Sequence, residues 1–304
     1  MYEFVMTRST ADNHDLTEAA RKAVREDGGF VLRNALPAKA VLRLRSELTA
    51  SFRRVSEQDW TWGELRRRAR ADDHLLGLRR ALFACPSNAE LFRHSRLRSF
   101  LGAVLDTSEP FLHPRRWLRL NEPGGGLGTW TTPYHQDHRF VQGTPDVLTV
   151  WTPLHDCDTG GLQVELRSHH DGLRPLGERG ETNHLPPVLG VDPGNIAEPA
   201  CELGDVVVFH SLVVHGTAAN QSRYNRISVD ARFQHPGDPI AGEQLIPAVA
   251  PQDERPIGVP GVDDPRPSAW SGDPGMAVPA SMPVVPAGDF HLSRPIAPSR
   301  FARP

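Results

Sequence analysis

The sequence has very little lysine, so almost all of its positive charge is carried by arginine. Lys22 and Lys39 are the only lysines among 34 basic residues. A cation that holds a carboxylate in a buried site of this chain is therefore expected to be an arginine, whose planar guanidinium can form two parallel hydrogen bonds with it. The formal net charge is −3 at pH 7, which gives no field that would recruit nucleic acid or an anionic membrane. We expect a small-molecule partner and leave the oligomeric state open.

Cysteine is also scarce. Cys85, Cys157 and Cys201 are the three present, an odd number without a CxxC pair. This pattern indicates neither a disulfide framework nor a zinc knuckle. We expect three buried, unreactive thiols.

Long apolar runs are missing as well. No stretch approaches the roughly 20 apolar residues that a membrane-spanning helix needs. Residues 1–8 lack the charged segment and following apolar run of a secretory signal. The expectation is a cytoplasmic protein without a membrane partner.

The first third of the chain has the signals of helices. Asp15, followed by Glu18, begins a helical pattern that Gly28 and Gly29 end. A short strand over 30–36 and a second amphipathic helix over 38–55 follow. Residues 57–105 are predicted to be helical too, with Pro86 as an interruption. Within them the basic stretch 66–70 is predicted to be a solvated helix face.

After Phe111 the pattern changes to short apolar runs separated by glycine, proline and asparagine. Strands are predicted over 147–154 and 161–164, and 172–202 is rich in loop residues. The last two strands, 205–214 and 226–233, are expected to pair through a polar turn. Helices followed by short strands predict an α+β domain whose strands form a sandwich or small barrel.

Proline marks the end of this domain. About half of the 28 prolines lie beyond His235, with few aromatic residues and no hydrophobic period. We therefore expect a domain over 1–235 and a C-terminal extension over 236–304 that is extended or partly disordered.

One candidate metal motif is a histidine and an aspartate two residues apart, His135 and Asp137. On a strand their side chains point to the same face. Two histidines and one carboxylate on one face of an iron(II) ion are the ligand set of oxygen-activating non-haem iron proteins. The spacing alone is weak, because 14 histidines and 37 acidic residues give one such pair by chance, and His169 with Asp171 forms a second.

A later segment, which contains His215 and Arg226, supports the interpretation of His135 and Asp137 as metal ligands. A β-branched run leads to His215 beside Gly216, and Arg226 begins the next strand. Alternation along 226–233 places Arg226 and the polar residues on one face and the apolar residues on the other. A hairpin would then present a metal ligand beside a guanidinium. A chelating 2-oxo acid needs such a cation for its distal carboxylate.

These residues resemble a known family, the phytanoyl-CoA dioxygenases, which are iron(II)- and 2-oxoglutarate-dependent oxygenases. The resemblance spans roughly residues 15–234. In chain order, its motifs are Gly29-Phe30-Val31-Leu32, His135-Gln136-Asp137, Trp151-Thr152-Pro153-Leu154, Gly161-Leu162-Gln163-Val164, Ser168-His169, and His215-Gly216-Thr217-Ala218-Ala219-Asn220 with Arg226. His169 falls where the family has a structural Ser-His, which favours the first histidine–aspartate pair.

The resemblance implies a double-stranded β-helix core of the jelly-roll or cupin type, with N-terminal helices packed on one sheet. It implies His135, Asp137 and His215 as iron ligands. Its implied co-substrate residues, all for 2-oxoglutarate, are Arg226, Thr217, Gln136 and Trp151. Arg119 is a further candidate for a polar contact upstream of the metal motif.

The implied activity uses Fe(II), 2-oxoglutarate and O2 to hydroxylate an unactivated C–H bond of a small molecule, most simply a natural-product or other biosynthetic intermediate. Related halogenases have a small residue in place of the carboxylate, so Asp137 favours hydroxylation. Desaturation, epoxidation and cyclisation use the same iron and stay open. So does a protein of another class, a β-helix that binds a metal or ligand without turnover.

Overall fold

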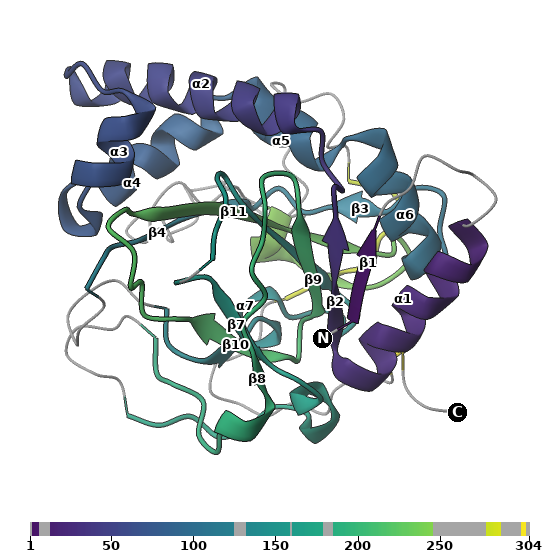
Figure 1. The fold of residues 1–304 in the computed structure, drawn as a ribbon. Coiled ribbons are helices and arrows are strands. Elements are labelled where there is room, and N and C mark those ends of the chain that lie inside the picture. The colour runs from purple at the N-terminus through teal and green to yellow at the C-terminus, as the bar shows by residue number, and fades with distance from the viewer. Residues whose placement is uncertain are drawn as a thin grey trace.

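A computed structural model describes residues 2–5, 13–124, 132–158, 160–178, 185–245, 278–286 and 299–301. In it two β-sheets face each other, and a layer of helices covers the outer side of the larger sheet (Figure 1). This arrangement confirms the predicted α+β class and the jelly-roll core with N-terminal helices on one sheet. None of the described helices is both long and apolar enough to cross a membrane.

The helices precede most of the strands, as the sequence predicts. They are α1 (Asn13–Asp27), α2 (Ala38–Ser56), α3 (Trp62–Arg68), α4 (Ala71–Phe83), α5 (Pro86–Phe92) and α6 (Ser95–Leu105). Local chemistry sets their starts: Thr61 and Glu64 form a reciprocal capping box at α3, and Pro86 occupies the first turn of α5, where its missing N–H costs nothing.

The larger sheet has the order β1-β2-β9-β6-β11-β3, and β4 also pairs with β11. Its strands are β1 (Tyr2–Val5), β2 (Gly29–Arg33), β3 (Phe111–Leu112), β4 (Trp117–Asn121), β6 (Leu148–Pro153), β9 (Val206–His210) and β11 (Arg226–Gln234). Except for the parallel pair β1–β2, these pairings are antiparallel.

The smaller sheet has the order β5-β10-β7-β8. Its strands are β5 (His135–Gln136), β7 (Leu162–Glu165), β8 (Ile196–Ala197) and β10 (Val214–Thr217), and helix α7 (His138–Val141) follows β5. The loop-rich stretch predicted over 172–202 contains β8 and a 3-10 turn at Pro193–Asn195 among its described residues.

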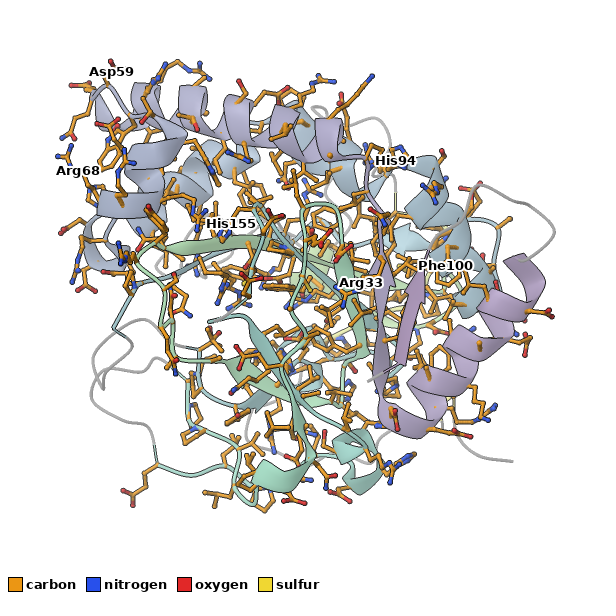
Figure 2. All side chains as sticks on the ribbon, viewed as in Figure 1. Arg33, Asp59, Arg68, His94, Phe100 and His155 are labelled. Atoms are coloured by element: carbon orange, nitrogen blue, oxygen red, sulfur yellow. The ribbon has the colours of Figure 1, made fainter. Side chains whose placement is uncertain are left out.

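The main hydrophobic core lies between the helices and the larger sheet. Ile227, Val229 and Phe233 on β11 are fully buried in it. Phe100 of α6, labelled in Figure 2, meets Phe30 of β2 edge to face, with ring centroids 6.0 Å apart. The alternation predicted for β11 is thus confirmed, and its polar face points to the other side, between the two sheets.

The predicted hairpin between 205–214 and 226–233 is wrong. The first segment breaks after His210, where the Val213 N–H donates to the His210 carbonyl and the Ser211 hydroxyl donates to the Pro145 carbonyl. Strand β9 stays in the larger sheet, whereas β10 pairs with β5 and β7 in the smaller one. As a consequence, β10 and β11 face each other across the space between the sheets.

The three cysteines are buried and free, as predicted. Burial raises the pKa of the Cys85 thiol to about 12, so this thiol is un-ionised at neutral pH.

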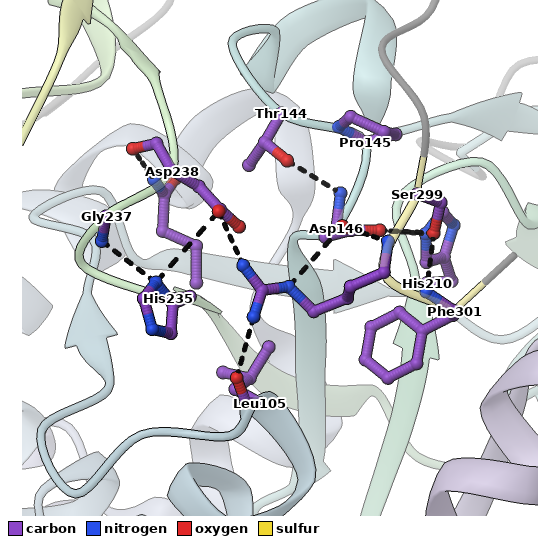
Figure 3. Close-up of polar contacts among 12 residues, drawn as sticks. Leu105, Thr144, Pro145, Asp146, His210, His235, Gly237, Asp238, Ser299 and Phe301 are labelled. Carbon is purple, nitrogen blue, oxygen red and sulfur yellow. Dashed lines mark hydrogen bonds and ion pairs between the residues drawn. The ribbon is translucent and has the colours of Figure 1, made fainter.

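Parts of the C-terminal extension pack against the domain. Strand β12 (Ile240–Ala241) pairs with β13 (Val284–Val285). Further on, the Arg300 guanidinium pairs with Asp146 and Asp238 and donates to the Leu105 carbonyl, and Phe301 is buried beside His210 (Figure 3). These described segments are ordered against the core, while the domain boundary at residue 235 stays a prediction.

Candidate metal centre

The smaller sheet brings the two distant histidines together. His135 on β5 and His215 on β10 are direct partners in the antiparallel register, and their ring centroids are 4.1 Å apart. The Asp137 Oδ1 atom lies 3.7 Å from the Nε2 atom of each. All three side chains are buried, and one ligand atom from each lies within 4.8 Å of the others. The three residues predicted as ligands therefore meet at one point.

Asp137 reaches this point by a different route from the one predicted. It lies just past β5 in helical conformation, with φ −60° and ψ −31°. Its carbonyl accepts the N–H groups of Phe140 and Val141, both at 2.9 Å, so the chain turns directly into α7. The prediction that His135 and Asp137 lie close because they share one face of a strand is thus wrong. Strand β5 ends at Gln136, and a tight helical turn brings the Asp137 carboxylate back toward His135.

Each histidine is oriented by its other ring nitrogen. His135 Nδ1 lies 2.8 Å from the Pro133 carbonyl, and His215 Nδ1 lies 2.9 Å from the Val213 carbonyl. A carbonyl only accepts, so Nδ1 is the protonated nitrogen and Nε2 keeps its lone pair toward Asp137. Burial lowers the pKa of both imidazoles. Both are therefore neutral at physiological pH, as metal binding requires.

Two neighbouring side chains, Thr149 and Arg232, bind the carboxylate of Asp137. Its Oδ2 accepts hydrogen bonds from Thr149 Oγ1 at 2.6 Å and from Arg232 Nη2 at 2.9 Å. Burial opposes its ionisation, but the charge of Arg232 and the hydrogen bond from Thr149 help to outweigh this effect and hold the pKa of Asp137 well below its usual range. The carboxylate is ionised, and Oδ1 faces the histidines.

A cavity opens beside these groups between the two sheets. It encloses about 350 Å³ of space up to and including its mouth. His135, His215, Thr217, Trp151 and Arg226 all line it. The structure thus places the predicted threonine, tryptophan and arginine around the same cavity as the two histidines.

Arg226 is 3% exposed, and most of its guanidinium is anchored. Nε donates to the Gly160 carbonyl at 2.9 Å, and Nη1 donates to Ser228 Oγ at 2.6 Å. Nη2 makes no hydrogen bond within the described part of the chain. Burial lowers the pKa of Arg226 to about 10, so the group remains a cation at neutral pH. A carboxylate in the cavity would find a fixed positive charge with a free donor.

The close approach at Gly160 depends on glycine. Its φ is +69°, and a Cβ atom there would lie 2.7 Å from the Asn220 Cα. A side chain would push apart the two loops that meet there and with them the carbonyl that anchors Arg226.

Two further charged residues of the cavity were not predicted as site residues. Arg232 contacts Asp137 and also pairs with Asp230, which in turn accepts from Arg119 Nε at 3.0 Å. Arg119, the candidate upstream contact, does line the cavity. The alternation along β11 already placed Asp230 and Arg232 on the face of Arg226, so the signal for them was present in the sequence.

Gln136 does not line the cavity, contrary to its predicted place in the co-substrate pocket. Its Nε2 donates to the carbonyls of Gly172 and Leu212, both at 2.7 Å, and its Oε1 accepts the Arg174 N–H at 2.9 Å. The side chain ties two loops together, since it follows His135 on a strand and points to the opposite face. His169 is also apart from the cavity, with Nε2 3.1 Å from the Arg25 carbonyl.

Comparison with known proteins agrees with this geometry. The family model for phytanoyl-CoA dioxygenase matches residues 24–228, about two thirds of the chain. The chain belongs to the phytanoyl-CoA dioxygenase family. It is thus an enzyme of the iron- and 2-oxoglutarate-dependent oxygenases, with iron, 2-oxoglutarate and O2 as cofactor and co-substrates.

Similar proteins are distant in sequence. The peroxisomal phytanoyl-CoA dioxygenase of Mus musculus is 27% identical over 240 residues, which cover 74% of this chain and 70% of the mouse protein. A 1-deoxypentalenic acid 11-beta-hydroxylase of Streptomyces arenae is 30% identical over 127 residues, covering 37% and 44%.

Solved structures share the fold. The epimerase SnoN, in complex with Fe3+, alpha ketoglutarate and nogalamycin RO, superposes with a TM-score of 0.55 at 17% identity, covering 82% of this chain and 93% of SnoN. EvdO2 of Micromonospora carbonacea var. aurantiaca, complexed with 2-oxoglutarate, gives 0.52 at 21% identity, covering 77% and 94%.

The donor set fits the metal that the family uses. Two neutral imidazoles that line a cavity, together with a buried carboxylate oxygen 3.7 Å from each, are the ligand types and number of a non-haem iron(II) site that keeps open positions.

Proposed function

We propose that this protein hydroxylates an unactivated C–H bond of a small-molecule biosynthetic intermediate, using iron(II) held by His135, Asp137 and His215. Iron in this site, when bound with 2-oxoglutarate, couples the decarboxylation of that co-substrate to succinate with oxidation of the substrate by O2. The observation that carries the proposal is the meeting of three ligand atoms, two of them from histidines that line a cavity, which a buried arginine with a free donor also lines.

The residues of the site have separate roles in holding the metal and 2-oxoglutarate. The Nδ1 contacts of the two histidines fix their rings, so that both Nε2 lone pairs are available without reorganisation. Arg226 and Thr217 line the cavity on the side where the distal carboxylate of 2-oxoglutarate would bind. Trp151 gives the guanidinium of Arg226 an aromatic wall, with Cζ 5.8 Å from the ring centroid. This wall keeps water from the charge and strengthens its attraction for a carboxylate.

Two observations favour hydroxylation over other outcomes. The carboxylate of Asp137 occupies the position that a halogenase would leave to a small residue. The Streptomyces relative named a hydroxylase is 30% identical in the segment it shares. Its substrate, 1-deoxypentalenic acid, also supports a biosynthetic intermediate as the substrate class.

The deciding measurement is succinate formation from 2-oxoglutarate by the iron(II)-loaded protein in the presence of O2. We expect the wild type to form succinate and CO2, and Asp137→Ala to form neither. Asp171→Ala is the matched control, because Asp171 belongs to the second histidine–aspartate pair and is exposed; it should behave as wild type. A wild type that binds iron and 2-oxoglutarate but forms no succinate would be a binding protein.

The Arg226→Met variant tests 2-oxoglutarate binding separately from metal binding. The variant keeps most of the side-chain volume but loses the cation, so the Kd for 2-oxoglutarate should rise about a hundredfold, corresponding to a lost charge-assisted hydrogen-bond pair. Iron affinity should stay unchanged. Turnover by Arg226→Met at the wild-type rate would mean that the enzyme does not depend on Arg226 to bind 2-oxoglutarate.

A further inference from the structure

A second cleft lies on the helical side of the molecule and shares no lining residue with the cavity beside the two histidines. Its walls are α2, α3 and the turns next to β6, β9 and β11. In Figure 2, His155 lies between the helical layer and the sheet, and Arg68 marks the end of α3. The cleft encloses about 810 Å³ up to and including its mouth, and its lining is Arg45, Trp62, Gly63, Arg66, Arg67, His155, Asp156, Leu203 and Tyr224.

Three guanidiniums meet in this arginine cleft with few partners. Arg45 stacks over Trp62, with Cζ 4.6 Å from the ring centroid, and Arg66 stacks over Tyr224 at 5.2 Å. Among the described residues, the side chains of Arg45 and Arg67 make neither a hydrogen bond nor an ion pair. The rings therefore hold the cations in place while most of their N–H donors stay free.

The predicted solvated face of residues 66–70 is thus only partly correct. Arg67, Arg68 and Arg70 are exposed, but Arg66 is half-buried. Its Nε donates to the Asn225 carbonyl at 3.2 Å, and its side chain lines the cleft.

The charge of the cleft is unbalanced. Burial lowers the pKa of Arg45 and that of Arg66, and the positive charge of Arg45 lowers the pKa of Arg66 further. The single carboxylate of the lining, Asp156, is exposed and accepts the Leu203 N–H at 2.8 Å. Like charges held together at a half-buried place cost free energy unless an anion compensates them.

His155 does not add to the positive charge. Burial, together with the nearby arginines, lowers the pKa of His155 to about 4. Both of its ring nitrogens are used: Nδ1 lies 2.7 Å from the Asp156 carbonyl, and Nε2 accepts the Ile227 N–H at 3.1 Å. Three arginines and one aspartate therefore leave two positive charges, which matches the charge of a phosphoryl group near pH 7.

We propose that the arginine cleft binds the phosphoryl group of a phosphate ester or diphosphate. Three guanidiniums converge from two helices, and the three or more oxygens of a phosphoryl group can pair with all of them, whereas a carboxylate has only two oxygens. The site is separate from the metal centre and does not rest on the proposed function. It shares one wall with that centre, because Tyr224 and Asn225 directly precede Arg226 on the chain and Asn225 Nδ2 donates to the Leu65 and Ala69 carbonyls at the end of α3.

The test is calorimetric titration of the full-length protein at low ionic strength with inorganic phosphate, pyrophosphate, ADP and acetate. Pyrophosphate and ADP should bind saturably, and acetate should not. Arg45→Gln should weaken both by about tenfold or more, as expected when a charge-assisted hydrogen bond is lost. Arg67→Gln, at an exposed position where no fold contact is lost, should weaken them as well.

Arg54→Gln is the matched control, since Arg54 is exposed on the same helix as Arg45 but does not line the cleft. It changes the net charge equally and should leave binding unchanged. The proposal fails if the wild type binds none of the three phosphoryl probes, if acetate binds as tightly as pyrophosphate, or if Arg54→Gln weakens binding as much as Arg45→Gln.

Discussion

Arg232 grips the carboxylate of Asp137 with two of its nitrogens. Nη2 lies 3.1 Å from Oδ1 and 2.9 Å from Oδ2, and Nε lies 3.3 Å from Oδ2. The guanidinium thereby fixes the rotation of the carboxylate that faces both histidines. The same guanidinium pairs with Asp230, so its own position is fixed from a second side.

We predict that Arg232→Gln weakens iron(II) binding by about 10- to 100-fold, the usual effect of removing a residue that orients a metal ligand. Arg232→Lys keeps the positive charge but loses the planar set of guanidinium N–H donors. Its iron(II) affinity should therefore lie between those of Arg232→Gln and wild type. The measurement is an anaerobic metal titration of the folded variants. Arg223→Gln, in an exposed turn, should bind as wild type does. Equal affinity of Arg232→Gln and wild type would mean that Arg232 only balances charge.

A second prediction concerns Gln136. Its truncation in Gln136→Ala leaves the buried Leu212 carbonyl, the partly buried Gly172 carbonyl and one N–H without their partner. We expect a loss of about 3 kcal/mol in the free energy of unfolding, measured by urea denaturation. The affinity for 2-oxoglutarate of the folded variant should stay within about twofold of wild type, since the side chain lies outside the cavity. Weaker 2-oxoglutarate binding at unchanged stability would instead support the pocket role that the sequence predicted.

The sequence predicted the composition of the site better than its geometry. The polar–apolar alternation of β11 identifies the face that carries Arg226, because a strand has a strict period of two. The same pattern does not say which strand lies beside it. Pairing of β10 with β5 depends on contacts between segments about 80 residues apart, and no local signal encodes them.

The break at His210 shows the same limit. A largely apolar, valine-rich run over 206–214 predicts one strand, yet the chain changes sheets within it. Tertiary contacts end β9: the Ser211 hydroxyl donates to the Pro145 carbonyl, and His210 Nε2 lies 3.4 Å from Asp146 Oδ1. Both partners come from a turn that is distant in sequence. The ends of α1 and α2, by contrast, were predictable within about two residues, because glycine and proline act locally, whereas the breaks that separate α3, α4 and α6 were not predicted.

A third prediction concerns the pH dependence of stability. His113 is fully buried, with Nε2 2.8 Å from Gln234 Oε1, and burial lowers the pKa of His113 to about 3. The unfolded chain takes up a proton near the ordinary pKa of about 6.5, whereas the folded chain does not. The stability that neutral His113 contributes is therefore complete above pH 6.5 and is lost progressively as the pH falls toward 3, by up to about 1.4 kcal/mol per pH unit.

His113→Gln removes this proton uptake. Its unfolding free energy should lie below that of wild type at pH 8, and the gap should narrow by about 1.4 kcal/mol per pH unit below pH 6.5. Urea denaturation at several values between pH 8 and about pH 5 measures both curves. Parallel curves would show that His113 does not contribute to acid sensitivity.

The last prediction tests whether the end of the C-terminal extension stabilises the domain. Asp146 is buried and accepts from the Arg300 backbone N–H at 2.7 Å, while the Arg300 guanidinium reaches the same carboxylate, Asp238 and the Leu105 carbonyl. Arg300 is about a quarter exposed, which screens part of this interaction. We expect Arg300→Ala to lower the free energy of unfolding by about 2 kcal/mol, because the buried carboxylate loses a charged partner.

Arg98→Ala provides the comparison, since Arg98 pairs with Glu109 where both side chains are exposed. An exposed pair contributes little, so this variant should lose less than about 1 kcal/mol. A difference of this size between the two variants follows only if the chain end is held against the turn at Asp146, which lies between α7 of the metal centre and β6. If Arg300→Ala is as stable as Arg98→Ala, the Arg300 side chain adds no stability through this contact.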